Sequence, residues 1–239
     1  MATGDTAKIK AGFKLFTGTD DLVVDTSLID MDVLTLSTAD DISASPVVVG
    51  IENINVNVTS VYGGDTGPTV LSFNADNLRN GNLNFDVTNV SSVVTGLVVT
   101  NLPLGVPVTS SNKFTSASIS ADDNAVVNYT GYATTLTLDS AGTLTDVNAT
   151  VRATTAGTIS TDSDATVTVV TAADTTVTAS AAASVIVTSA GQATITANAA
   201  DRVTVTATEE ALVTANAATT VTFVTGDGID TTSASEIGR

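Results

Sequence analysis

The stretch SDATVTVVTAADTTVTAS (163–180) aligns without a gap to the two blocks that follow it, AAASVIVTSAGQATITAN (181–198) and AADRVTVTATEEALVTAN (199–216). The same 18-residue register extends to TDVNATVRATTAGTISTD (145–162) before them and to AATTVTFVTGDGIDTTSA (217–234) after them. A fixed period of this size is typical of repeat architectures, in which each repeat packs on its neighbours.

Each block contains two segments in which apolar and polar residues alternate, and this alternation predicts two short strands. Equivalent positions of successive blocks hold like residues. This recurrence favours stacked coils, because equivalent residues of successive coils then lie about 4.8 Å apart and pack on each other. An antiparallel meander would require only that apolar and polar residues alternate within each strand. The Asn-Gly and Asp-Gly dipeptides that favour hairpins are absent from 145–216. We therefore expect an all-β, right-handed parallel β-solenoid (β-helix) with one 18-residue, two-strand coil per block.

The gapless register assigns apolar columns to the interior and threonine columns to the exterior. It places Ala149 and Val151 of the first block below Val167 and Val169 of the second. The predicted solenoid core comprises Val167, Val169, Val177, Val185, Val187, Ile195, Val203, Val205, Val213, Val221 and Phe223. The outward threonines form a T-x-T face made of Thr176, Thr178, Thr194, Thr196 and Thr214.

Upstream of the repeats, strand-like runs persist but their spacing varies, and Gly and Pro interrupt the chain more often. We expect wider, irregular coils or a small β-sandwich there. The predicted organisation is a basic docking or cap strand (1–16), this irregular part (17–114), a regular solenoid (115–234) and a short tail (235–239).

The strings GIENINVNVTS (50–60), LSFNADNL (71–78) and LNFDVTNV (83–90), followed by Thr/Val/Ala repeats, resemble the repeat-rich β-solenoid regions of bacterial surface-layer and type I secreted (RTX-like) proteins. The resemblance implies an extracellular structural role. The calcium-binding nonapeptide of RTX repeats is not reproduced, since the corners read TAAD, SAGQ and TEEA. No calcium site is therefore carried over from that family.

Composition excludes several functions. The 239 residues include no Cys and no His, so a disulfide framework, a thiol nucleophile, a zinc finger and a Ser/His/Asp triad are ruled out. The net charge of −17 opposes binding to a phosphate backbone. No apolar run could span a bilayer, and residues 1–16 lack the apolar segment of a secretory leader. We expect no enzyme activity, nucleic-acid partner, membrane insertion or N-terminal signal peptide.

Three of the eight basic residues lie close together near the N-terminus. Lys8, Lys10 and Lys14 alternate with apolar residues, and with Phe13 they form the candidate docking site. One interpretation is an assembly arm that lies on an acidic neighbour. The other is a cap strand that covers the end of its own solenoid, since lysines commonly protect sheet edges.

The remaining polar residues of note are acidic pairs and the threonines of the T-x-T face. The acidic pairs Asp20–Asp21, Asp40–Asp41 and Asp122–Asp123 supply carboxylates of the kind that calcium prefers, but their spacing matches no known calcium loop. We therefore expect no cofactor, and calcium binding is not supported by a motif. The T-x-T face is similar to the threonine arrays of ice-binding β-solenoids, but Leu212 interrupts its first column and Asp230 ends it. Ordinary solvent-facing threonine ladders that stabilise the coil are the preferred interpretation.

These features favour a non-enzymatic structural surface protein. The first expectation is a component of a phage virion, such as a capsid decoration or fibre subunit, that self-assembles or docks through its N-terminal strand. The alternatives are a bacterial surface-layer or extracellular matrix or adhesin protein, and an ice-binding solenoid. The expected partners are further copies of the chain or other structural proteins, on a virion or an extracellular surface.

Overall fold

The computed structural model describes residues 6–10, 22–24, 33–38, 43–44, 47–49, 53–58, 69–76, 78, 81–87, 94–112, 114–122, 125–140, 142–226 and 229–232. In these residues the protein contains strands and no helix, and every strand pair is parallel. The chain alternates between two long sheets, so that successive pairs of strands form the coils of a parallel β-solenoid. The predicted fold class is confirmed.

The first sheet has 11 strands, and each strand lies beside the one contributed by the preceding coil. In order, they are β1 (Thr6–Lys10), β3 (Val33–Thr38), β6 (Asn53–Val58), β8 (Asn82–Val87), β10 (Val108–Ser110), β12 (Val126–Gly131), β14 (Asp146–Val151), β16 (Thr166–Thr171), β18 (Ser184–Ser189), β20 (Arg202–Ala207) and β22 (Thr220–Thr225).

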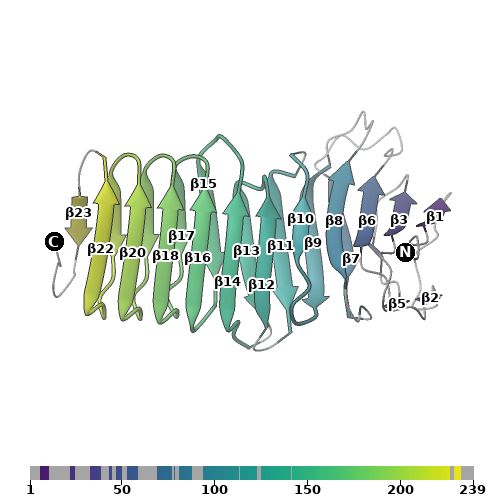
Figure 1. Cartoon of the computed structure of the whole chain (residues 1–239), viewed down its shortest axis with the longest axis horizontal. Helices are drawn as coiled ribbons and strands as arrows, with labels where there is room; N and C mark the ends of the chain where they lie inside the picture. The colour runs from purple at the N-terminus through teal and green to yellow at the C-terminus, as the bar shows by residue number, and fades with distance from the viewer. Residues whose placement is uncertain are drawn as a thin grey trace, which may run out of the picture.

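The second sheet has 10 strands and faces the first across the core. Its strands are β4 (Ser43–Ala44), β7 (Thr69–Asn74), β9 (Val94–Leu102), β11 (Ser116–Ala121), β13 (Thr135–Ser140), β15 (Gly157–Thr161), β17 (Thr175–Thr178), β19 (Ala193–Thr196), β21 (Ala211–Thr214) and β23 (Ile229–Thr232). A third sheet of two strands pairs β2 (Leu22–Val24) with β5 (Val47–Val49). Figure 1 shows the stacked strands as an elongated body, with β1 at one end and β23 at the other.

The coils narrow along the chain. On the first sheet, Ile54 pairs with Leu83 in the earlier part, whereas Val167 pairs with Val185 in the repeats, so the earlier coil contains a longer stretch of chain. The buried aromatic side chains Phe73, Phe85, Phe114 and Tyr129 all belong to the earlier coils. Because longer coils enclose a wider cross-section, they need large side chains to fill it, and valine, isoleucine and alanine suffice in the shorter coils of the repeats.

Buried apolar columns run along the interior. One column on the first sheet passes through Val127, Val147, Val167, Val185, Val203 and Val221. The column that faces it on the second sheet passes through Leu136, Ile159, Val177, Ile195 and Val213. Every residue predicted to form the core is buried except Phe223, which is partly buried against the core.

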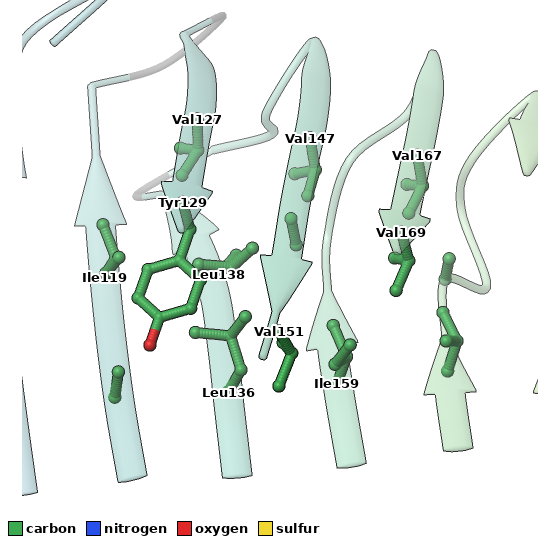
Figure 2. Close-up of a cluster of buried hydrophobic side chains, with 14 of the residues drawn as sticks. Ile119, Val127, Tyr129, Leu136, Leu138, Val147, Val151, Ile159, Val167 and Val169 are labelled. Atoms are coloured by element: carbon green, nitrogen blue, oxygen red, sulfur yellow. The ribbon is translucent and has the colours of Figure 1, made fainter. Parts of the chain in front are cut away.

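Tyr129 occupies the transition from wider to narrower coils. Its ring extends into the core beside Leu136 and Leu138, as Figure 2 shows, and its hydroxyl lies 2.7 Å from Ser110 Oγ. The Ala133 N–H donates a hydrogen bond to the same hydroxyl, at 3.2 Å. Burial raises the pKa of Tyr129, and these two hydrogen bonds partly oppose that shift.

The predicted register of the first block is wrong on one sheet. Val147 pairs with Val167 and Ala149 with Val169, so Ala149 and Val151 are not below Val167 and Val169. On the second sheet, Ile159 pairs with Val177, as the repeat register predicts. The difference lies in the corner 152–156 between β14 and β15, which is two residues longer than the corner 172–174 between β16 and β17.

The irregular first half belongs to the same solenoid. Strands β6 to β10 pair in parallel with their neighbours in the two long sheets. Beyond the predicted boundary at residue 114, β11 pairs with β9 and β12 pairs with β10. The described residues of this half therefore form wider coils, and the alternative of a small β-sandwich is not what the structure shows.

Candidate functional surfaces

The N-terminal strand β1 is the first strand of the first sheet. It pairs with β3 of its own chain, and the register places Lys8 beside Thr35 and Lys10 beside Ser37. One edge of β1 is thus paired within the chain, and the cap-strand and assembly-arm interpretations both stay predictions. Phe13 and Lys14, the other two predicted docking residues, lie outside the described residues.

The predicted T-x-T face lies on the outer side of the second sheet. Thr176 pairs with Thr194, and Thr178 with Thr196, which in turn pairs with Thr214. Thr176 is exposed, and the other four side chains are partly exposed. The five residues therefore lie in two straight columns, and Leu212 follows Thr194 in the first of them.

The same two columns continue upstream: the 18-residue register already places Thr158 before Thr176, whereas the more distant members were not predicted from the sequence. The register extends the first column back from Thr176 through Thr158 and Thr135 to Ser116, and the second column back from Thr178 through Ser160 and Thr137 to Ser118. We call these 12 outward positions on β11 to β21 the hydroxyl face. Of these 12 positions, Leu212 alone lacks a hydroxyl and none is charged, but Asp230 on β23 pairs with Leu212 and follows it in the first column.

Two carboxylates stack next to the hydroxyl face. Leu138 pairs with Thr161, so Asp139 and Asp162 follow in register on adjacent coils. Asp162 Oδ2 accepts a hydrogen bond from the Ser140 N–H at 3.1 Å, while the Oδ1 atoms of both carboxylates are buried without a partner. Burial and the neighbouring Asp162 charge raise the pKa of Asp139, and a hydrogen bond from Ser120 partly opposes that shift.

The outer side of the first sheet differs from the hydroxyl face. Its outward positions include the exposed apolar residues Val170, Ile186 and Val224, together with the exposed Arg202. Asparagine side chains also stack there between coils, as in the hydrogen bond of 3.0 Å from Asn148 Nδ2 to Asn128 Oδ1. Threonines such as Thr168, Thr204 and Thr222 also occupy outward positions there, but apolar, basic and amide side chains interrupt their columns, so this face is less uniform than the hydroxyl face.

In the described part of the chain, no group of three or more acidic side chains lies close enough together to hold a metal ion. None of the described segments is a helix of the length and hydropathy needed to cross a membrane.

The stacked parallel coils, in-register columns and aliphatic core define this chain as a repeat protein of the β-solenoid class. No family model, no curated protein and no solved structure matches the chain. The expected relation to surface-layer and RTX-like repeats therefore stays a prediction.

Proposed function

We propose that the protein is a non-enzymatic structural component of an external surface, in the first instance a decoration or fibre subunit of a phage particle. The observation that carries the proposal is the uninterrupted parallel pairing of 11 strands, which extends from β1 to β22. At about 4.8 Å per strand, this sheet forms a body roughly 48 Å long. A continuous ladder of backbone hydrogen bonds suits a rigid spacer or support.

In this proposal the chain binds its partner through β1. One edge of β1 pairs with β3, and no described strand pairs with its other edge. An available strand edge can accept a strand from another chain. Lys8 and Lys10 on β1 favour an acidic partner, and a second copy of this chain, with its net charge of −17, is acidic.

The test compares two variants that change the net charge by the same amount. We expect the purified 239-residue chain to form ordered assemblies in sedimentation velocity and negative-stain electron microscopy, and Lys8→Glu/Lys10→Glu to abolish them. The matched control Arg152→Glu/Arg202→Glu alters two exposed basic residues elsewhere and should assemble like the wild type. A monomeric wild-type chain, or equal assembly by both variants, would contradict docking through β1.

Other observations would distinguish a phage particle from a bacterial surface layer or matrix. Capsid and portal genes beside this gene would support the phage particle, whereas a neighbouring secretion ATPase gene would support a surface-layer or matrix protein. Assemblies that form only with calcium and dissolve in a chelator would also favour the surface layer.

The hydroxyl face supports ice binding as a second candidate function. It presents two in-register columns over six neighbouring strands of the second sheet, β11 to β21, and no position in them is charged before Asp230 on β23. Hydroxyl groups repeated at about 4.8 Å along a flat sheet form a regular array, which a crystalline surface can match.

Thermal hysteresis tests this candidate directly. We expect Thr196→Tyr to abolish ice affinity, because a bulky side chain disrupts the flat array. Thr204→Tyr is the matched control, since Thr204 occupies a partly exposed position on β20 of the other sheet. A wild-type chain without thermal hysteresis would exclude ice binding.

A further inference from the structure

The longer corner between β14 and β15 borders a small cavity that is partly open to solvent. Side chains and backbone of three consecutive coils line it, among them Ala133, Val151, Gly157, Thr171 and Thr175. The centre of a water molecule has about 10 Å³ of free space inside. This is close to the smallest volume that holds one water.

Thr175 makes the wall of this cavity polar. Its residue is 4% exposed, and its Oγ1 atom is buried without a hydrogen-bond partner in the protein. The register places Thr175 in line with Gly157, Ala193 and Ala211, so the neighbouring coils have no hydroxyl at this position. A buried hydroxyl without a partner destabilises the fold, and such groups in native proteins usually bind ordered water.

Backbone carbonyls supply further acceptors near the cavity. Thr134 O accepts the Thr158 N–H at 2.6 Å, and Asp174 O accepts the Gly157 N–H at 2.9 Å. Each carbonyl oxygen has a second lone pair. Thr134 O also lies 3.1 Å from the point where a Cβ atom on Gly157 would be, so the lack of a side chain at Gly157 leaves this oxygen uncovered.

We infer that this cavity binds one ordered water molecule, which forms a hydrogen bond with Thr175 Oγ1 and joins the longer corner to the coils on either side. The nearby hydroxyls of Thr171 and Ser189 need no water, because each has a hydrogen-bond acceptor within the protein. Both of their hydroxyls donate to Ala173 O, at 3.0 and 2.8 Å. Thr175 has no such acceptor in the protein, so the water takes that role.

Water ¹⁷O relaxation dispersion counts the long-lived internal waters of the full-length protein in solution. We expect Thr175→Val, which keeps the shape of the side chain and removes the hydroxyl, to lower the count by one. Thr175→Ser keeps the hydroxyl and should leave the count unchanged. An unchanged count in Thr175→Val would overturn the inference, as would the same loss in Thr175→Ser.

Thermal melting is an independent test, because Thr175→Val should change Tm in opposite directions for a hydrated and for a dry cavity. If the water is present, Thr175→Val displaces it together with its hydrogen bonds and lowers Tm by a few degrees. If the cavity is dry, the same change removes an unpaired polar group and raises Tm. A higher Tm in Thr175→Val would therefore also overturn the inference.

Discussion

At the scale of single residues, Tyr129 and Gly131 depend on each other. A Cβ atom on Gly131 would overlap both the Tyr129 hydroxyl and Ser110 Oγ. Gly131 is buried, so no flexible surface side chain could move aside to make room. The glycine is therefore required because the tyrosine hydroxyl and its partner fill the space beside it.

We predict that Gly131→Ala destabilises the protein by about 1–3 kcal/mol, the usual cost of overpacking. Tyr129→Phe should cost about 1–2 kcal/mol, because it leaves the buried Ala133 N–H and Ser110 hydroxyl without their partner. Urea denaturation of the double variant should show a total smaller than the sum, since removing the hydroxyl relieves part of the overlap. Strict additivity would contradict the proposed coupling.

Alkaline pH should unfold the wild type more readily than Tyr129→Phe. Because burial raises the pKa of Tyr129, the unfolded chain loses this proton first, at about pH 10. The stability that the protonated tyrosine contributes is complete below pH 10 and is lost as the pH rises toward the raised value. Thermal melts between pH 8 and pH 11 should therefore show a steeper fall for the wild type, and parallel curves would contradict this.

Asp139 gives a pH dependence at the acidic end. Since its pKa is raised in the folded state, its penalty is present at neutral pH and disappears as the pH falls below the unfolded value of about 4. Asp139→Asn should thus stabilise the protein at pH 7 by about 0.5 kcal/mol, a small value because solvent screens the pair. At pH 3 the variant and the wild type should unfold alike. Asp164→Asn, at an exposed position, serves as the surface control.

At the scale of the structural elements, the regular strands were predictable from sequence and the corner lengths were not. Like residues recur at the repeat period from Val167 onward, and the structure pairs them as the repeat indicates. In the first block, Val147, Ala149 and Val151 are all apolar and all buried. A shift of two positions keeps the same side chains inside, so the pattern alone could not locate the longer corner.

The hydroxyl face was only partly predictable for a related reason. Thr158 lies one 18-residue period before Thr176, but Thr135 and Ser116 precede it at unequal spacings, so a fixed period does not bring these two into line. The backbone pairing of the strands does bring them into line. The stacked pair Asp139 and Asp162 was hidden by the same irregular spacing.

We predict that deleting Thr154 and Thr155 is tolerated. The deletion gives the corner 152–156 the same length as the corner 172–174, and both deleted side chains are exposed. Circular dichroism should show an unchanged strand content, with a change in unfolding free energy within about 1 kcal/mol. Deleting Ala172 and Ala173 is the control. It leaves a single residue between β16 and β17, and we expect that chain to lose cooperative unfolding.

At the scale of the whole molecule, each 18-residue coil is an interchangeable unit. Deleting residues 181–198 removes one complete coil and places Val203 directly beside Val167 in the same column. We predict a folded, cooperative protein that is less stable by roughly 1–3 kcal/mol, in proportion to the length of chain lost. The comparison is deletion of 181–197, which shifts the register by one and turns threonines inward. Equal stability of the two deletions would contradict column stacking.

The wider and the narrower coils also differ in what they contribute to tyrosine fluorescence. The chain contains no Trp and three Tyr, of which Tyr129 is buried among the wider coils and Tyr132 is exposed beside it. No tyrosine follows Tyr132, so the 18-residue coils contribute almost nothing to tyrosine emission. Tyrosine fluorescence therefore reports the wider coils alone, while far-ultraviolet circular dichroism reports all strands. Unfolding curves from the two signals would separate if the narrow coils melt first and coincide if the solenoid unfolds as one unit.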